Sequence, residues 1–183
     1  MPAAENHLQR RFLVAHPHHT WAGDITYIPT GAGWLYLAVL MDVYSRRIIG
    51  WAMATRITAE LTRNALEMAL QQRGVSVGLL HHSDRGSQYG AALYQQRLTE
   101  VGIQCSMSRP GNCWDHAVVE SFFATLKTER THHRRYATWQ EAQTEIFQYL
   151  EAFYNRQRRH STLGYLTPVE FERQAGQVTG GVH

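Results

Sequence analysis

Residues 34–44 form the run WLYLAVLMDVY, which is apolar and aromatic apart from a single charged residue, Asp42. A run of this kind is typical of a strand that is covered on both faces of its sheet. Two further strands are predicted beside it, over residues 21–29 (WAGDITYIP) and 48–55 (IIGWAMAT), where β-branched and aromatic residues are frequent. Because the connections TGAG and SRR are short, we expect these three strands to pair antiparallel.

Helices and strands alternate in the next part of the chain. One helix is predicted from its N-cap Thr58 to Gly74, and another over residues 87–102 (SQYGAALYQQRLTEVG). Short apolar segments at residues 75–80 (VSVGLL) and 103–107 (IQCSM) predict a fourth and a fifth strand. Since strands that are separated by helices usually pair in parallel, we expect this half of the sheet to be parallel.

Two more helices are predicted, one from about Cys113 to Arg130 and one that begins with the capping box Thr138–Glu141. Beyond HSTLGYLTP (160–168) the sequence predicts only a thinning tail. The predicted fold class is α/β, a ribonuclease H-like fold whose five-stranded mixed sheet has three antiparallel and then two parallel strands, flanked by helices. The predicted organisation is an N-terminal arm over residues 1–20, a core over 21–160 and a C-terminal tail over 161–183.

The composition is that of a folded protein of one domain, with 183 residues, 44% of them hydrophobic and 18% charged. The formal charge of +3 permits a polyanionic partner without requiring one. Basic residues gather at RTHHRR (130–135) and RQRRH (156–160), although solvated helix ends explain such clusters equally well. With two cysteines, no signal-peptide core and no apolar window of roughly 20 residues, we expect a soluble protein of the reducing cytoplasm without a membrane span.

Two aspartates occupy positions that suggest a site. Asp24 lies within an otherwise apolar and aromatic strand, where a charge is costly unless it is paired or binds a cation. Asp84 follows the fourth strand, at the edge where open α/β sheets bind their ligands. A single aspartate at a strand end is more often a turn or cap residue, so both interpretations stay open. His81 and His82 have no third partner at metal-ligand spacing, and we interpret His81 as structural and His82 as at most a neighbour of the site.

The predicted helix over residues 113–130 carries a third carboxylate on its polar face. At 100° per residue, Glu120 and Lys127 lie opposite the apolar stripe and face the same space. Taken alone, Lys127 is more often a solvated helix residue. The polar face is completed by His116 and Ala124, and the apolar stripe consists of Val118, Val119, Phe122 and Leu126.

Asp24, Asp84 and Glu120 together form a set of hard oxygen ligands. Mg²⁺ prefers such carboxylates and keeps waters and phosphate oxygens in its remaining positions. Clustered carboxylates repel one another, and a bound cation relieves that repulsion. Two such ions, roughly 3.5–4 Å apart, would activate an attacking oxygen and stabilise a leaving oxygen in an in-line displacement at phosphorus.

At these residues the chain resembles the catalytic core of DDE transposases and retroviral integrases, in particular the larger (OrfB) subunit of bacterial insertion-sequence transposases of the IS-three type. As in that family, 35 residues lie between Asp84 and Glu120, and Lys127 stands seven positions after the glutamate. The resemblance covers roughly residues 6–173. It is carried by WAGDITYI, YLAVLMDVYSRRIIGWAM, HHSDRGSQY, SMSRPGNCWDHAVVESFFATLKTE and YNRQRRHSTLGYLTP.

The resemblance implies that Asp24, Asp84 and Glu120 are the catalytic triad of an integrase core and bind Mg²⁺ or Mn²⁺, with two ions when DNA is bound. Lys127 is then expected near the DNA end. Asp42 recurs in a family motif outside the triad, and we interpret it as structural, together with Asp115. Weaker candidates for phosphate contacts, which a solvated surface explains equally well, are Arg85, Arg109, Arg156 and Arg159.

The chain also departs from the family. His116 stands where the family more often has Asn, a change that bears on DNA contacts or activity. Family members usually carry a further N-terminal helical region, and a partner subunit supplies helix-turn-helix recognition of the element ends. Since this sequence begins almost at the core, we do not expect sequence-specific binding by the chain alone. The partners implied by the resemblance are DNA, as transposon ends and target, a homo-oligomer on that DNA and the helix-turn-helix subunit, at the bacterial nucleoid.

The predicted function is therefore that of a transposase or integrase core, a polynucleotidyl transferase. It would expose a 3′-OH at the element end by hydrolysis and then use that hydroxyl to attack a target phosphodiester, without a covalent protein intermediate or ATP. One alternative is a metal-dependent nuclease of the same fold, which only hydrolyses. Another is a catalytically silent DNA-binding or interaction fragment, which would bind no Mn²⁺ at Asp24 and Asp84.

Overall fold

The computed structural model describes residues 16–84, 86–107 and 117–179. Its five strands form one mixed sheet in the order β3-β2-β1-β4-β5. β1, β2 and β3 pair antiparallel, whereas β4 and β5 pair in parallel on the other side of β1. This arrangement confirms the predicted ribonuclease H-like sheet. The strands are β1 (Thr20–Thr30), β2 (Gly33–Asp42), β3 (Ile48–Ala54), β4 (Leu80–Ser83) and β5 (Gln104–Met107).

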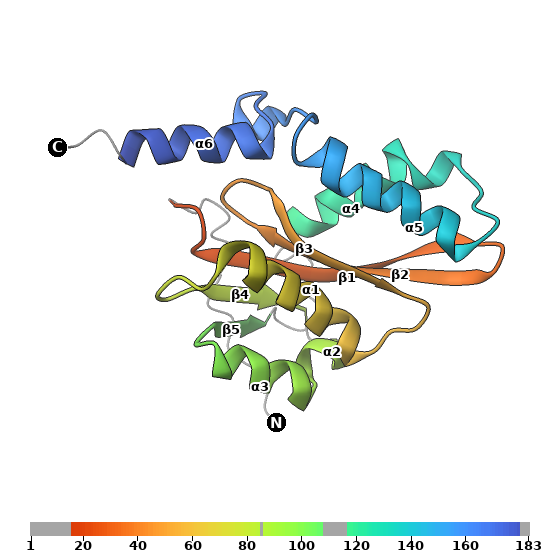
Figure 1. Cartoon of the computed structure of the whole chain (residues 1–183), viewed down its shortest axis with the longest axis horizontal. Coiled ribbons are helices and arrows are strands. Elements are labelled where there is room, and N and C mark those ends of the chain that lie inside the picture. Colours follow the sequence, from red (N-terminus) through yellow and green to blue (C-terminus); the bar gives the residue numbers. More distant parts are fainter. Residues whose placement is uncertain (1–15, 85, 108–116, 180–183) are drawn as a thin grey trace.

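Helices cover both faces of the sheet, with α1, α2 and α3 on one side and α4 and α5 on the other (Figure 1). None of the helices in the described part of the chain is long and apolar enough to cross a membrane. The helices are α1 (Ala59–Arg73), α2 (Ser87–Gly90), α3 (Ala92–Glu100), α4 (Ala117–Glu129), α5 (Trp139–Gln148) and α6 (Pro168–Thr179). The described residues also form three short helical segments: η2 (Thr131–His133), the π-helical η3 (Tyr149–Tyr154) and η4 (Ser161–Leu163).

β2 supplies both halves of the core, which explains its apolar sequence. Leu37 and Val39 are fully buried in the cluster that includes residues of α4 and α5. Ala38 and Leu40 are fully buried in the cluster that includes residues of α1 and α3. Because successive strand residues point to opposite faces, a strand between two helical layers has to be apolar at every position. The prediction of a strand covered on both faces is confirmed for residues 35–43, whereas Trp34, at the start of the predicted run, is 50% exposed.

The fourth strand was predicted at residues 75–80, which is wrong, because β4 begins at Leu80 and includes both histidines. The histidines are buried and paired: His81 Nε2 lies 2.9 Å from the Tyr94 hydroxyl, and His82 Nδ1 lies 2.9 Å from Ser106 Oγ. Hydrogen-bonded polar side chains are tolerated in a buried strand. These contacts agree with a structural interpretation of His81.

The single helix predicted over residues 87–102 is two helices. Ala91 has φ −63° and ψ 140°, an extended conformation that ends α2 and serves as the N-cap position of α3. The interruption turns the chain between the two helices, so that Tyr89 of α2 and Tyr94 of α3 both lie buried against the sheet. Their rings form a T-shaped pair with a centroid distance of 5.3 Å.

α6 occupies residues for which the sequence predicted only a thinning tail. Its start is a capping box: Thr167 Oγ1 accepts the Glu170 N–H at 3.2 Å, and Glu170 Oε2 accepts the Thr167 N–H at 2.9 Å. Pro168 is its first residue, a position that suits proline. The division into arm, core and tail stays a prediction.

An ion-pair cluster attaches α6 to the rest of the molecule. The Glu172 carboxylate accepts hydrogen bonds from Ser45 Oγ at 2.7 Å, from Arg47 at 2.8 Å and from Arg73 at 2.6 Å. The side chains of Arg73 and Glu172 are only 10% and 11% exposed, so water screens their attraction weakly. Residues of the β2–β3 turn and of α1 thereby converge on one carboxylate of α6.

We expect Glu172→Ala to lower the free energy of unfolding by roughly 2–4 kcal/mol, because it leaves two partly buried arginines without their acceptor. The matched control is Gln174→Ala, which also introduces an alanine into α6 but at an exposed position. Thermal unfolding followed by circular dichroism measures both variants. Equal melting temperatures for the two would show that Glu172 does not hold α6 in place.

Candidate active site

β1 and β4 bring Asp24 and Asp84 side by side. The parallel register pairs Gly23 with Ser83, and the two aspartates are the next residues along these neighbouring strands. Paired strands lie about 4.8 Å apart, so side chains at matching positions are neighbours. The structure therefore brings together the two aspartates that the sequence singled out.

Gly86 fixes the direction in which the chain leaves Asp84. The Gly86 N–H donates a hydrogen bond of 2.8 Å to Asp84 Oδ1. A Cβ at position 86 would lie only 2.8 Å from the same oxygen, so a larger residue would press on the carboxylate. Glycine thus allows the backbone to turn into α2 while it stays within hydrogen-bonding distance of the side chain.

Tyr89 lies close to both aspartates and was not among the predicted site residues. The residue is 1% exposed, and burial raises its pKa well above the ordinary value, with smaller contributions from Tyr94 and from the carboxylates of Asp24 and Asp84. Within the described residues, its hydroxyl has no hydrogen-bond partner. Its sequence signal was weak, because a tyrosine in a four-residue helix shows no periodicity. The rings of Tyr89 and His81 are in contact in the buried layer beneath the two aspartates, with a centroid distance of 6.0 Å.

Four charged groups of the predicted site act on one another. The pKa of Asp24 is raised from 3.8 to about 7, mainly by burial and to a smaller extent by the carboxylates of Asp84 and Glu120. The Ile25 N–H, which donates to Asp24 Oδ1 at 2.7 Å, and the Lys127 ammonium oppose that increase. Asp24 therefore lies within electrostatic reach of all three other residues that the sequence placed at this site.

α4 turns Glu120 and Lys127 toward the same open groove, which has a volume of about 430 Å³. Its apolar stripe is buried as predicted, and Glu120 is exposed. Lys127 Nζ lies 5.2 Å from the centre of the Tyr27 ring, at the end of β1 that carries the site. Ala124, which the sequence placed on the same polar face, also lines the groove. The sequence did not point to the remaining lining residues, which are Thr26, Phe123, Thr128 and His132.

The donor set suits a hard divalent cation. Asp24 and Asp84 offer only oxygen ligands, and Mg²⁺ is commonly held by one or two carboxylates together with waters and substrate phosphates. Burial and like charge make ionised Asp24 unstable, and a cation would relieve both effects. Across residues 16–84, 86–107 and 117–179, no three His, Cys, Asp or Glu side chains are close enough to hold one ion together. Two carboxylates from the strands, with Glu120 as a further oxygen on α4, are what the chain presents.

The remaining predicted residues lie elsewhere or outside the described part. Arg156 and Arg159 are exposed on the segment that follows η3, and neither lines the groove of Glu120. Asp42 is fully buried and accepts the backbone N–H groups of His18 and Tyr44 at 2.9 and 3.0 Å, as a structural residue does. The predictions for Arg85, Arg109, Asp115 and His116 concern residues outside the described part.

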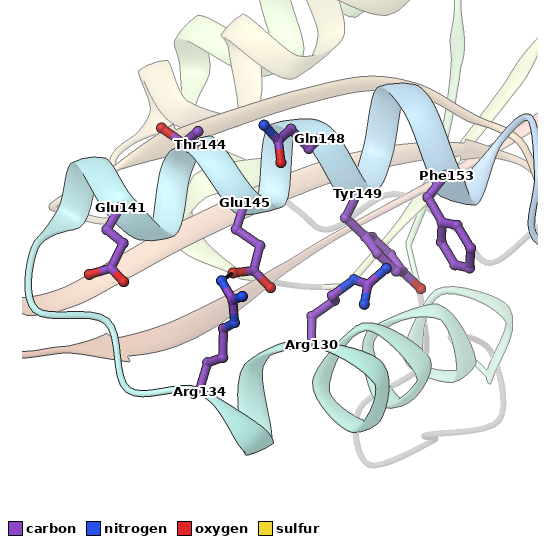
Figure 2. Close-up of a pocket in the computed structure, with 8 residues that line it drawn as sticks. All are labelled: Arg130, Arg134, Glu141, Thr144, Glu145, Gln148, Tyr149 and Phe153. Atoms are coloured by element: carbon purple, nitrogen blue, oxygen red, sulfur yellow. Dashed lines mark hydrogen bonds and ion pairs between the residues drawn. The ribbon is translucent and has the colours of Figure 1, made fainter.

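A larger hollow, of about 550 Å³, lies between η2 and α5 and does not include the carboxylate site (Figure 2). Its basic groups are already engaged. Arg134 forms an ion pair with Glu145, and the Arg130 guanidinium lies 5.4 Å from the Tyr149 ring and 5.1 Å from the Phe153 ring. The acidic residues of the site belong to a different part of the surface, on α4 and the strand ends.

Comparison with known protein families agrees with the fold and the site. Residues 14–113 match the integrase core domain, and residues 101–168 match a second family of the same description. The chain belongs to the integrase core domain family, as a catalytic core of the DDE transposase and integrase type.

Its relatives include proteins of bacterial insertion sequences. It is 47% identical over 178 residues to an uncharacterized 31 kDa protein of insertion element IS600 from Shigella sonnei, a match that covers 97% of this chain and 65% of that protein. It is 46% identical over 174 residues to transposase InsF for insertion sequence IS3fB from Escherichia coli, which covers 95% of this chain and 60% of the transposase. The chain thus spans less than two thirds of the length of these relatives.

Solved structures share the fold at low sequence identity. A chain of the simian T-cell lymphotropic virus intasome superposes with a TM-score of 0.73 at 20% identity, covering 94% of this chain and 58% of that one. The HTLV-2 integrase catalytic core domain in complex with magnesium superposes with a TM-score of 0.63 at 17% identity, covering 86% and 98% of the two chains. The architecture is therefore that of retroviral integrase cores.

Asp24 should make the stability of the metal-free chain depend on pH. Because folding raises its pKa, the folded chain keeps a proton between about pH 4 and 7 that the unfolded chain has released, and stability falls as the pH rises through this window. Asp24→Asn removes this loss. We expect the variant to be more stable than the wild type by roughly 1–3 kcal/mol at pH 8 in EDTA, and the difference to shrink toward pH 4. Urea unfolding at several pH values tests this, and a difference that is constant with pH would contradict the assignment.

Proposed function

We propose that this chain cleaves and joins DNA 3′ ends in a reaction that depends on a divalent metal ion. The observation that supports this best is the convergence of Asp24, Asp84 and Glu120 in one electrostatic environment, at the edge of an integrase-type sheet. The names of its relatives point the same way, since they belong to insertion sequences and one is a transposase. The reaction class is polynucleotidyl transfer, as part of DNA transposition.

In this proposal the metal is Mg²⁺ or Mn²⁺, with two ions when DNA is bound. Asp24 would hold the metal from within β1 and Asp84 from the end of β4, and Glu120 would complete the second site from α4. When bound, the ions activate the attacking oxygen and stabilise the leaving oxygen in an in-line displacement at phosphorus. The magnesium in the HTLV-2 core structure supports the choice of metal.

The side chains around the carboxylates would position the DNA. Lys127 lines the groove that also contains Glu120, where its ammonium group can contact a phosphate beside the reacting one. Arg156 and Arg159, both exposed, stay candidates for contacts to more distant phosphates, as do Arg85 and Arg109. These contacts would fix the register of the DNA without reading its sequence.

The proposed partners are transposon ends, target DNA and further copies of the chain. The HTLV-2 core is described in dimeric and trimeric forms, which supports an oligomer on DNA. Recognition of the element ends by a helix-turn-helix subunit and association with the nucleoid stay predictions.

We expect Asp84→Asn and Glu120→Gln each to reduce Mn²⁺-dependent strand transfer by at least about 100-fold, because each removes a charged metal ligand from the site. The substrate is a pre-cleaved duplex with the terminal sequence of the element that encodes the chain, and joined products are separated on a gel. Glu60→Gln is the matched control, since Glu60 is an exposed carboxylate on α1, across the sheet from α4. Unchanged activity in both site variants would contradict the assignment.

The same assay separates the alternatives. A nuclease of this fold would give Mn²⁺-dependent shortened products and no joined products. A catalytically silent DNA-binding fragment would give neither, and its affinity for DNA would not depend on Mn²⁺. Melting temperatures of all variants in EDTA show whether a loss of activity comes from a loss of folding.

A further inference from the structure

A second polar cavity lies on the side of α4 that faces away from the groove of Glu120. At 100° per residue, Ser121 and Thr125 point 100–140° around the helix from Glu120. The cavity has a volume of about 190 Å³. Its lining comes from three parts of the chain: α4, the β2–β3 turn, and η3 with the segment that follows it. The polar residues of this lining are Ser121, Thr125, Arg46, Tyr154, Arg158, His160, Ser161 and Thr162.

Two guanidinium groups give this cavity its charge. Within the described residues, Arg46 has no carboxylate within 4 Å. It lies in the β2–β3 turn with a left-handed backbone conformation, at φ 62°. Arg158 donates through Nε to Glu129 Oε1 at 2.8 Å, and its terminal amino groups form no other hydrogen bond to a described residue. The single carboxylate of Glu129 balances only one of the two arginines, so the net charge around the cavity is positive. Guanidinium groups with free terminal N–H groups are suited to the oxygens of a phosphate.

His160 adds an incompletely satisfied polar group to the same wall. Its side chain lines the cavity, the residue is 8% exposed, and its ring packs on Tyr154 at a centroid distance of 5.0 Å. Nε2 is removed from solvent and has no hydrogen-bond partner in the part of the chain that the structure describes. Burial, Arg158 and Arg46 lower the pKa of His160 to about 4, so its ring is neutral near pH 7. A buried nitrogen without a partner costs free energy that an oxygen acceptor in the cavity would recover.

We propose that this cavity binds one phosphate group of a DNA backbone, held by Arg46 and Arg158, with a hydroxyl donor from Ser121. The Thr125 hydroxyl lines the cavity but donates to the Ser121 carbonyl at 2.9 Å. The volume suits a single phosphate and is too small for a nucleotide with its base. Arginine and hydroxyl side chains are the usual contacts to DNA phosphates. The choice of DNA over free phosphate rests on the proposed function.

The inference gives a role to the motif YNRQRRHSTLGYLTP, which the active site does not use. The sequence drew attention to Arg156 and Arg159, but both side chains are exposed, whereas Arg158 and His160 are turned into the cavity. α4 would then be contacted by DNA on two sides, with the reacting strand in the groove of Glu120 and another stretch of backbone at Arg46. A duplex bound in this way would be held on either side of the helix that carries Glu120.

The test is the salt dependence of DNA binding by the full chain, measured by fluorescence anisotropy with a labelled duplex in EDTA. Loss of one phosphate contact lowers the slope of log K against log salt by about one. We expect Arg46→Gln and Arg158→Gln each to lower the slope by about one, and the double variant to lower it no further, because both arginines hold the same phosphate. Arg63→Gln on α1, across the sheet from α4, is the matched control and should leave the slope unchanged. Ser121→Ala keeps both arginines and should weaken binding without a change in melting temperature.

A second measurement identifies the source of the phosphate. Inorganic phosphate is titrated into the wild type and into Arg46→Gln while the imidazole resonances of His160 are followed by NMR. Phosphate-dependent shifts in the wild type alone, together with the lowered slope, support the proposal. The same shifts with an unchanged slope would overturn the assignment to DNA in favour of a free phosphate compound. The absence of both effects would show that the cavity binds no anion. Because both measurements omit the metal, a failure of strand transfer would contradict the proposed function and leave this result standing.

Discussion

The parallel pairing of β1 with β4 is the constraint on which the rest of the site depends. It aligns Gly23 with Ser83, so the next residue on each strand is an aspartate, and two like charges meet at one edge of the sheet. One of them is largely removed from water, which raises the pKa of Asp24 to about 7. A protein gains nothing in stability from this arrangement. The arrangement is explained if the two carboxylates are preorganised for a divalent cation. A bound cation would offset both the loss of hydration and the repulsion between them.

α4 connects this site to the remainder of the molecule. Its apolar stripe, with Val119 and Leu126 fully buried, fixes the rotation of the helix against β1 and β2. That rotation turns Glu120 and Lys127 toward one groove and Ser121 and Thr125 toward the positive cavity behind the helix. A single packed helix thus presents Glu120 to the proposed metal site and Ser121 to the proposed phosphate site, and its buried stripe keeps the two at a fixed separation.

The sequence predicted those features that follow from local periodicity. The apolar and aromatic composition of residues 21–29 and the 100° steps along α4 were enough to single out Asp24 and Glu120, and strand-helix alternation predicted the parallel edge with Asp84. It did not predict α6, although Thr167 and Glu170 form a capping box, because only a short apolar pattern follows the box. Tyr89 and the cavity of Arg46 and Arg158 could not be predicted, since they depend on contacts between residues far apart in the chain.

The central claim is that Asp24 and Asp84 form a metal site in this chain, and anomalous diffraction from crystals soaked in Mn²⁺ tests it most directly. The account predicts a Mn²⁺ peak at coordination distance from both carboxylates in the wild type, and no peak there in Asp84→Asn. A wild-type crystal with no peak between Asp24 and Asp84, or with Mn²⁺ bound only at other carboxylates, would contradict it.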